Sequence, residues 1–277
     1  MTRDELRSLF SLDGQVAVVT GAAGVLYSGI CKALGELGVK LAILDLRADA
    51  AQAVAHDIAQ AGGEAIGVAC DVLKRDSIEA ARDAVIARFG HADILINGAG
   101  GNNPKATATD QLSFFDIPPE AIRWVFELNC LGSLLPCQVF GQHFADRKQG
   151  VILNTSSMNA FRPLTRIVAY SAAKAAVSNF TQWLAVHMAK NYSPAIRVNA
   201  IAPGFFLGEQ NRFLLIDEKT GDLTPRGKTI IEHTPMGRFG VPDDLIGTVV
   251  WLLSPAARFV TGIVVPIDGG FSAFSGV

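Results

Sequence analysis

Tyr170 and Lys174 stand four residues apart in the run YSAAK, among small residues that favour a helix. If this run is helical, both side chains lie on the same face. A phenol is a poor base at neutral pH because its reference pKa is near 10, but a nearby fixed positive charge favours phenolate and lowers that pKa. The pair could therefore donate and accept a proton. The same spacing also fits a tyrosine that covers a core beside a lysine with its charge in water, so the rest of the chain must supply a site.

The run VAVVTGAAGVLYSGICKALGELG is typical of a strand, a glycine turn and a helix. Gly21 and Gly24 allow a tight turn that a pyrophosphate can approach, and the helix that follows offers free N–H groups and a positive dipole end. Asp45 ends the next apolar run, where a carboxylate accepts hydrogen bonds from the adenosine ribose and repels a 2′-phosphate. We therefore predict NAD as cofactor. Arg47 leaves NADP possible, since an arginine can accommodate the 2′-phosphate.

Short β-branched runs alternate along the chain with segments of helical spacing. Strands that are almost continuously apolar are buried on both faces, which is typical of parallel sheets. Alternating β and α elements favour right-handed crossovers and a doubly wound sheet. The sequence thus predicts one α/β domain of Rossmann type over residues 1–277, with a mostly parallel sheet of seven strands. The predicted strands are Val16–Thr20, Leu41–Leu44, Ala65–Ala69, Ile94–Asn97, Val151–Thr155, Ile196–Ile201 and Ile263–Ile267.

Two segments interrupt this regular pattern. A long helix is expected from about Pro119 to Ala145, although Pro136 should kink or shorten it. The longest segment expected to be irregular is Phe205–Thr234. Because long loops in compact domains are usually functional, we predict a lid-like insertion at about residues 205–235.

Composition excludes several classes of protein. With a net charge of -2 and no basic run, nucleic acid is not an expected partner. The polar N-terminus is neither a signal peptide nor an apolar anchor, and no apolar stretch reaches the roughly 20 residues that span a bilayer, so we expect a cytoplasmic protein. The five histidines are scattered and no C-x-x-C spacing occurs, so no metal site is predicted. Charged residues make up only 18%, which favours surfaces buried against other subunits.

Taken together, the motifs resemble those of the short-chain dehydrogenase/reductase family over nearly the full length. The resemblance implies a nicotinamide-dependent oxidoreductase acting on CH–OH groups, commonly a homotetramer. The motifs that carry it are TGAAGVL (Thr20–Leu26), Asp45, CDV (Cys70–Val72), NGAG (Asn97–Gly100), LN (Leu128–Asn129), NTSS (Asn154–Ser157), YSAAK (Tyr170–Lys174), VNAIAPG (Val198–Gly204) and IDGG (Ile267–Gly270).

The resemblance also implies catalytic roles for four residues. Ser157 is expected to bond to the substrate oxygen, and Tyr170 to act as acid in reduction and as base in oxidation. Lys174 is expected to bind the nicotinamide ribose and to lower the pKa of the tyrosine. Asn129 is expected to hold a water that links the lysine to solvent. The protein's task would be orientation and one proton, because hydride transfer is the chemistry of the cofactor.

The family pattern further implies a set of cofactor contacts, from the glycine turn to the nicotinamide. Two positions depart from it. Tyr27 stands where the last glycine of the family's turn belongs, and we expect it over the cofactor or near the substrate. Gly208 lies near a position at which many members have a threonine, so the replacement for that contact stays open. The expected cofactor contacts are Gly21, Gly24, Val25, Leu26, Asp45, Asp71, Val72, Asn97, Gly98, Ala99, Tyr170, Lys174, Pro203, Gly204 and Phe206.

Basic and amide side chains suggest the class of substrate. Arg162 and Arg166 lie between the serine and the tyrosine, in a segment that borders the substrate in this fold. Guanidinium groups bind carboxylates through two hydrogen bonds, and amides suit sugar hydroxyls. Each basic residue could equally be a solvated surface charge. The substrate candidates are Asn102, Lys105, Asn159, Arg162, Arg166, Asn211 and Arg212.

Two stretches, the lid and SMNAFRPLTR, resemble the D-mannonate oxidoreductase (fructuronate reductase) branch of the family. This resemblance implies reversible reduction of D-fructuronate to D-mannonate. A 3-oxoacyl thioester reductase and a polyol dehydrogenase remain alternative enzymes. A nucleotide-sensing regulator without turnover is the alternative that is not an enzyme, and the intact Tyr170/Lys174 pair counts against it.

Overall fold

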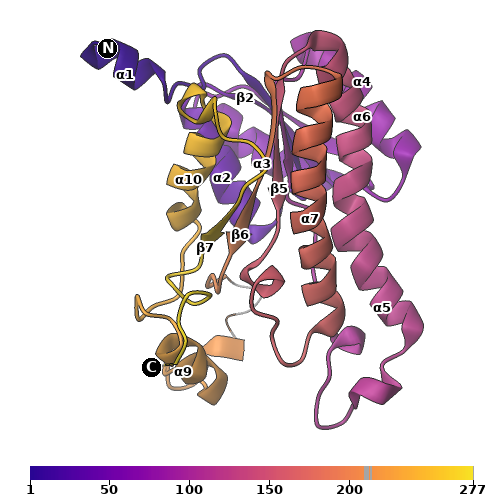
Figure 1. Ribbon diagram of the computed structural model, residues 1–277, viewed down its shortest axis with the longest axis vertical. Helices are drawn as coiled ribbons and strands as arrows, with labels where there is room; N and C mark the ends of the chain where they lie inside the picture. Colours follow the sequence, from indigo (N-terminus) through magenta and orange to yellow (C-terminus); the bar gives the residue numbers. More distant parts are fainter. Residues whose placement is uncertain (209–211, 213, 277) are drawn as a thin grey trace.

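A computed structural model describes the chain except for residues 209–211, 213 and 277 (Figure 1). Its sheet has seven strands in the order β3-β2-β1-β4-β5-β6-β7, and every neighbouring pair is parallel. The α/β architecture predicted from the sequence is confirmed. The sheet is wholly parallel, where the prediction was mostly parallel.

The strands coincide closely with the apolar runs of the sequence. β1, β3 and β4 match the predicted bounds. β2 and β5 are longer than predicted because polar or glycine residues at their ends still pair in the ladder. β6 is longer because Ala202 and Pro203 still pair with β7, and β7 begins one residue later. The strands are β1 (Val16–Thr20), β2 (Lys40–Asp45), β3 (Ala65–Ala69), β4 (Ile94–Asn97), β5 (Gly150–Thr155), β6 (Ile196–Pro203) and β7 (Val264–Ile267).

Helices cover both faces of the sheet, each over its own apolar cluster (Figure 1). α2 (Val25–Glu36), α3 (Ala48–Gln60) and α10 (Asp243–Leu253) pack on one face. α4 (Arg75–Phe89), α6 (Gly132–Arg147) and α7 (Val168–Asn191) pack on the other. The short helix α1 (Arg3–Ser8) buries no residue and projects from the body. Short 3₁₀ turns occur at Pro104–Ala106, Phe114–Asp116, Met158–Ala160 and Pro255–Ala257.

The expected helix from Pro119 to Ala145 is divided into three parts. α5 (Pro119–Phe126) passes into a π turn at Glu127–Leu131 and then into α6, which contains Pro136. The proline lacks the N–H that would bond to the carbonyl four residues earlier. The interruption that the sequence suggested at the proline is thus a widened turn just before it. Such π turns are frequent at functional sites.

The segment expected to be irregular, Phe205–Thr234, contains regular structure. α9 (Pro225–Glu232) is capped by Thr224, whose hydroxyl accepts from the N–H of Gly227 at 3.0 Å. An isolated antiparallel bridge joins Ile216 to Leu223. The expectation of a structureless loop is therefore wrong for these residues. α9 and the C-terminal tail lie at the same end of the molecule as α5 (Figure 1).

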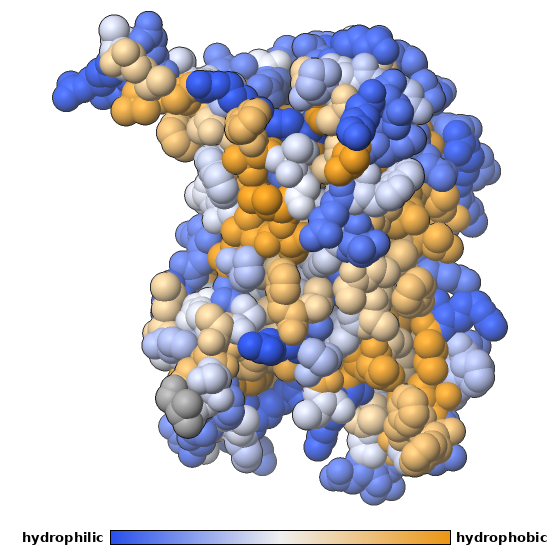
Figure 2. Space-filling model, viewed as in Figure 1, coloured by the Kyte–Doolittle hydropathy of each residue, from blue (hydrophilic) through white to orange (hydrophobic). Residues whose placement is uncertain are grey.

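Apolar side chains gather in two places on the visible surface. Figure 2 shows one patch over α5 and another along α10 and β7. On α5 and α7, Trp124 and Trp183 are exposed, as is Val186. No helix in the described part of the chain combines the length and apolar character needed to cross a membrane.

Candidate active site

The predicted site residues lie at the carboxyl ends of the central strands. β1 and β4 are neighbours although five elements (α2, β2, α3, β3 and α4) separate them in sequence, so the strand order reverses direction between them. In open α/β sheets, ligands bind outside the carboxyl ends of the strands at such a switch point. The glycine turn after β1, the segment after β4 and the serine pair after β5 all begin there.

Tyr170 and Ser157 are brought together by the start of α7 and the end of β5. The Ser157 hydroxyl interacts with the Tyr170 phenol. Ser157 is buried, and its hydroxyl also accepts from the N–H of Asn159 at 3.3 Å. Burial raises the pKa of Tyr170, and the interaction with Ser157 opposes that rise. The sequence predicted a lowered pKa for Tyr170, and this is wrong for the protein alone because desolvation of the phenol outweighs the other contributions.

Lys174 lies against the face of the phenol, not at its hydroxyl. Its ammonium is 5.6 Å from the centre of the Tyr170 ring and donates to the main-chain oxygen of Thr155 at 2.8 Å. The side chain is only 2% exposed. Burial lowers the pKa of Lys174 from 10.5 to about 8, and Cys130 opposes that effect. A lysine with its pKa near the working range is suited to proton exchange with its surroundings.

Asn129 lies in the π turn and is fully buried. Its amide nitrogen donates to the carbonyl oxygens of Gly101 (2.6 Å) and Val125 (2.8 Å), and its side-chain oxygen accepts from the N–H of Gly101 at 3.1 Å. A Cβ atom on Gly100 would come within 2.7 Å of that side-chain oxygen and 3.3 Å of the Lys174 ammonium. Asn129 and Lys174 therefore both lie against Gly100, which is the closeness that the predicted proton relay requires. The water expected on Asn129 stays a prediction.

The glycine turn is shaped for close approach of a ligand backbone. Gly21 has φ +62, and a Cβ there would meet the main chain of Ala99 at 2.7 Å. Gly24 begins α2 with an ordinary φ of -73 and no side-chain cap, so the first N–H groups of the helix are left for a ligand. Val25 and Leu26 form the half-buried first turn. This cradle fits the pyrophosphate of a dinucleotide.

Asp45 closes the other side of the same turn. One carboxylate oxygen accepts from the N–H of Ala23 at 3.2 Å, and the other accepts from the N–H of Arg47 at 3.1 Å. The Arg47 guanidinium stands 3.7 Å from the carboxylate and is largely exposed. Both groups are thus placed at the end of β2, where an adenosine ribose would bind.

Four more of the predicted cofactor contacts lie in two places, after β3 and beside the glycine turn. Asp71 and Val72 follow β3, with Val72 buried and Asp71 within 3.5 Å of the Lys74 ammonium. Gly98 and Ala99 lie beside the turn, since both N–H groups bond to the Thr20 hydroxyl. These positions are compatible with the prediction.

Two of the predicted cofactor side chains point elsewhere. Asn97 faces the core, where its amide donates to Asn154 at 2.8 Å, so its side chain is not beside a cofactor. The ring of Phe206 packs on Gly240, where a Cβ would meet it at 2.7 Å. The main chain of either residue could still border the cofactor, so both contacts stay predictions.

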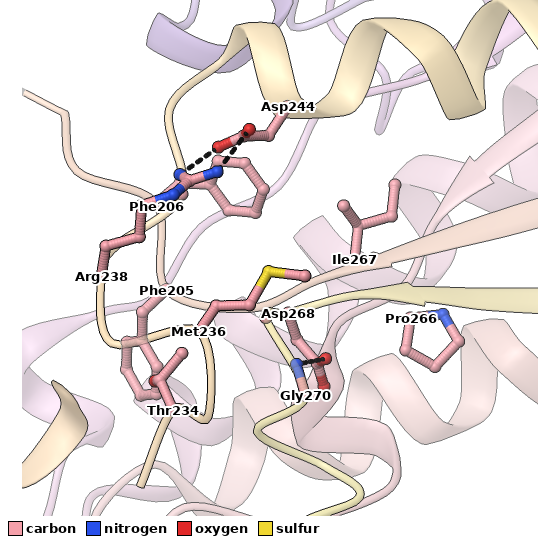
Figure 3. A pocket seen from close by; sticks show the side chains of 12 residues that line it. Phe205, Phe206, Thr234, Met236, Arg238, Asp244, Pro266, Ile267, Asp268 and Gly270 are labelled. Carbon is pink, nitrogen blue, oxygen red and sulfur yellow. Dashed lines mark hydrogen bonds and ion pairs between the residues drawn. The ribbon is translucent and has the colours of Figure 1, made fainter. Parts of the chain in front are cut away.

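Phe206 also lines a cavity of about 360 Å³ (Figure 3). Its wall includes Met236, Asp268 and the ion pair of Arg238 with Asp244, whose atoms approach to 2.6 Å. Gly204 adjoins this wall, since a Cβ there would meet Asp268 at 2.6 Å. Neither Ser157 nor Tyr170 lines the cavity, so it is separate from the catalytic candidates.

Tyr27 corrects a further expectation. Its side chain is 4% exposed and belongs to the core under the glycine turn, so it is not free to lie over a cofactor or to contact a substrate. The hydroxyl bonds to the Thr155 hydroxyl, and the ring fills the space left by Gly98, where a Cβ would meet it at 2.6 Å.

The substrate candidates do not share a partner. Arg162 donates to the main-chain oxygen of Ser272 at 3.1 Å, whereas Arg166 lies 4.0 Å from Asp110. The Asn102 amide donates to the hydroxyl of Thr107. The two arginines therefore form no clamp. Lys105, in the 3₁₀ turn that follows β4, is exposed.

Asn159 and the lid candidates complete the set. Asn159 is buried, and its side-chain oxygen has no hydrogen-bond partner among the described residues. Arg212 lines a hollow of about 540 Å³ with Ala23 and Ser28, so it faces the glycine turn rather than the other substrate candidates. Asn211 lies outside the described residues.

Sequence reasoning missed Thr155 and Gly100. Thr155 provides the main-chain oxygen for Lys174, and a main-chain acceptor leaves no signal in residue type. Gly100 was recognised only as part of a motif, although its missing Cβ is what lets Asn129 and Lys174 approach. In the described part of the chain, no three His, Cys, Asp or Glu side chains are grouped so as to hold a metal ion.

Comparison with known proteins agrees with this geometry. A family profile described as enoyl-(acyl carrier protein) reductase matches residues 21–272. The chain is 48% identical to the uncharacterized oxidoreductase UxuB of Bacillus subtilis (strain 168), over 96% of this chain and 98% of that protein. It is 36% identical to the D-threitol dehydrogenase of Mycolicibacterium smegmatis, over 95% of each.

A solved structure is also similar. It is that of a proposed D-mannonate oxidoreductase from Haemophilus influenzae with bound NAD. The TM-score is 0.90 at 47% identity, and the match covers 96% of this chain and 98% of that one. With the family profile spanning most of the chain and relatives this similar over nearly their whole length, the chain belongs to the short-chain dehydrogenase/reductase family of oxidoreductases.

Proposed function

We propose that this protein interconverts D-fructuronate and D-mannonate, a ketone and an alcohol of a sugar acid, with NAD as cofactor. One observation carries the proposal of catalysis: the Lys174 ammonium lies 5.6 Å from the centre of the Tyr170 ring, and the Ser157 hydroxyl interacts with the same phenol. A proton donor, a second hydroxyl and a buried cation lie together at the carboxyl ends of the central strands. Such a site can bind and protonate a carbonyl oxygen.

Each residue has a defined task in this proposal. The Ser157 hydroxyl orients the substrate oxygen, and Tyr170 gives it a proton in reduction or takes one in oxidation. Lys174 replenishes that proton, and its lowered pKa favours exchange near neutral pH. When bound, the nicotinamide supplies or accepts the hydride.

The residues that would hold NAD are those of the turn and strand ends. Gly21, Gly24, Val25 and Leu26 would hold the pyrophosphate, and Asp45 the adenosine ribose. Asp71 and Val72 would border the adenine. The main chain of Gly98, Ala99, Pro203 and Gly204 would line the path to the nicotinamide. The Asp45 carboxylate favours NAD over NADP because it would repel a 2′-phosphate.

The sugar-acid substrate is supported by the likeness to the Haemophilus protein with bound NAD. It is also compatible with cationic groups near the site, although Arg162 and Arg166 have separate partners. The test is a turnover screen of keto-uronates, aldonates, polyols and 3-oxoacyl thioesters with both cofactors. Turnover of D-fructuronate with NADH at the highest kcat/KM supports the proposal, and a preference for another class refutes this substrate.

A polyol dehydrogenase is the second candidate, favoured by the likeness to a D-threitol dehydrogenase. The same screen separates the two. A sugar-acid enzyme loses activity when the carboxylate of the substrate is replaced by a primary alcohol. A polyol enzyme is more active on the alcohol than on the acid.

Assembly as a homotetramer, a cytoplasmic location and lid movement at residues 205–235 stay predictions. The apolar patches over α5 and along α10 and β7 support burial between subunits (Figure 2). Scattering that gives the mass of a monomer would contradict the tetramer.

A further inference from the structure

Tyr27 is a buried phenol at the position where the family's turn has a glycine. It lies in the first turn of α2, and its ring occupies the space beside Gly98. A Cβ on residue 98 would come 2.6 Å from that ring, so the glycine and the tyrosine fit one another. Burial raises the pKa of Tyr27, so its hydroxyl stays protonated and can donate.

The direction of the hydrogen bonds follows from counting protons. The Thr155 hydroxyl donates to the main-chain oxygen of Asn97. It has no second proton, so the bond between the two hydroxyls must be donated by Tyr27. Tyr27 thereby ties the first turn of α2 to the end of β5, and through Thr155 to the end of β4.

The same threonine supports the candidate catalytic lysine. Its main-chain oxygen accepts the 2.8 Å bond from the Lys174 ammonium. The titratable groups facing that ammonium are Tyr170 and Cys130. Tyr27 and Lys174 thus bond to the same residue, Tyr27 to its hydroxyl and Lys174 to its main-chain oxygen.

We propose that Tyr27 is a positioning residue, which holds Thr155 so that its carbonyl oxygen keeps the Lys174 ammonium against Tyr170. This inference rests on the proposed function, because it gives Lys174 a role in the reaction. The first turn of α2 also forms the proposed pyrophosphate site. One helical turn would therefore serve both cofactor binding and the placement of the lysine.

The experiment compares single-hydroxyl deletions in the full-length chain. Tyr27→Phe removes the donor and keeps the ring in place, and Tyr192→Phe is the matched control on the surface. Thr155→Val removes the acceptor, whereas Thr155→Ser keeps it. The measurements are kcat, the Kd for NADH, the melting temperature, and the pKa of Lys174 from competitive acetylation read by peptide mass spectrometry.

If Tyr27 positions the lysine, Tyr27→Phe lowers kcat by roughly tenfold to a hundredfold while the Kd for NADH stays within about twofold. The pKa of Lys174 rises by about one unit because a lysine released from its carbonyl regains water. Thr155→Val reproduces both effects, and Thr155→Ser restores most of the loss.

Two results would overturn the inference. In one, Tyr27→Phe matches Tyr192→Phe in kcat and in the pKa of Lys174. In the other, kcat, NADH binding and melting temperature fall together with the lysine pKa unmoved, which means that Tyr27 only packs. If the wild type reduces no substrate at all, the proposed function fails separately. The acetylation measurement, which needs no substrate, still decides whether Tyr27 holds the lysine.

Discussion

The Lys174 ammonium rests on the main-chain oxygen of Thr155, at 2.8 Å, in a pocket that leaves the side chain only 2% exposed. No carboxylate is paired with it among the described residues. A buried cation held by a carbonyl and a ring face is costly to the fold, because both replace water imperfectly. The stability of the protein should therefore reveal the same desolvation that lowers the pKa of Lys174.

Replacing Lys174 with Met should abolish turnover and raise the free energy of unfolding below pH 8. Because the pKa falls from 10.5 in the unfolded chain to about 8 in the folded one, the unfolded state binds the proton more tightly. This cost, at most about 3 kcal/mol, is complete below pH 8 and disappears as the pH rises to 10.5.

Urea unfolding of both proteins at several pH values checks this prediction. The stability advantage of the Met variant should shrink between pH 8 and 10.5. A variant that is less stable than the wild type at neutral pH would contradict the account of a desolvated charge.

Adding one methyl group at Gly100 should disturb the site without unfolding the chain. The new Cβ would lie 2.7 Å from the Asn129 side-chain oxygen and 3.3 Å from the Lys174 ammonium, so both must move. We expect Gly100→Ala to lower kcat by roughly a hundredfold.

Gly101→Ala is the matched control, since its Cβ meets only Leu128, at 4.0 Å. Steady-state kinetics and melting curves of the two variants make the comparison. Equal losses of kcat in both would show that the space beside Asn129 and Lys174 is not critical.

The carboxylate of Asp45 should set the preference for NAD. Without it, the N–H groups of Ala23 and Arg47 lose their acceptor, and the Arg47 guanidinium loses its only ionic partner in the described part of the chain. Asp45→Ala should weaken NADH binding by about tenfold and strengthen NADPH binding.

Fluorescence titrations with NADH and NADPH measure both effects. Asp57→Ala, which breaks an exposed ion pair with Lys32, is the control. Unchanged cofactor preference in the Asp45 variant would place the adenosine ribose elsewhere.

Arg212 should act on the cofactor and not on the substrate. Its place in the hollow beside Ala23 and Ser28 puts a cation near the N-terminus of α2, where a pyrophosphate would bind. Arg212→Ala should raise the Kd for NADH by about fivefold to tenfold, with a smaller change in the KM of the sugar acid. Arg226→Ala, on α9, provides the control for loss of a positive charge. A larger effect on the KM of the sugar acid than on the Kd for NADH would show that Arg212 binds the substrate.

The strands were predictable because the interior strands of a parallel sheet are apolar on both faces. Runs such as Val16–Thr20 and Ile94–Asn97 therefore stand out in the sequence and match the structure to the residue. The π turn at Glu127–Leu131 was not predictable, because the residue types of one helical turn do not distinguish a π turn from an α turn. The helix α9 was missed since Pro225 and Gly227 resemble loop residues, although a proline in the first turn is favourable.

Within the site, residue types were predictable from the sequence, and their environments were not. The sequence motifs identified Ser157, Tyr170 and Lys174 as candidates, and the structure brings all three together at the carboxyl end of β5. The rise in the Tyr170 pKa depends on burial by segments far away in sequence. The inward turn of Tyr27 depends on the absent side chain at Gly98, a pairing that only the folded chain reveals.

The most direct test of the central claim is the turnover of D-fructuronate with NADH by the wild type and by Tyr170→Phe, together with the Kd of each for NADH. If the Tyr170 hydroxyl delivers the proton, the variant loses roughly a hundredfold to ten-thousandfold in kcat while its Kd for NADH stays within about twofold. A Tyr170→Phe protein that reduces the ketone as fast as the wild type would contradict the account.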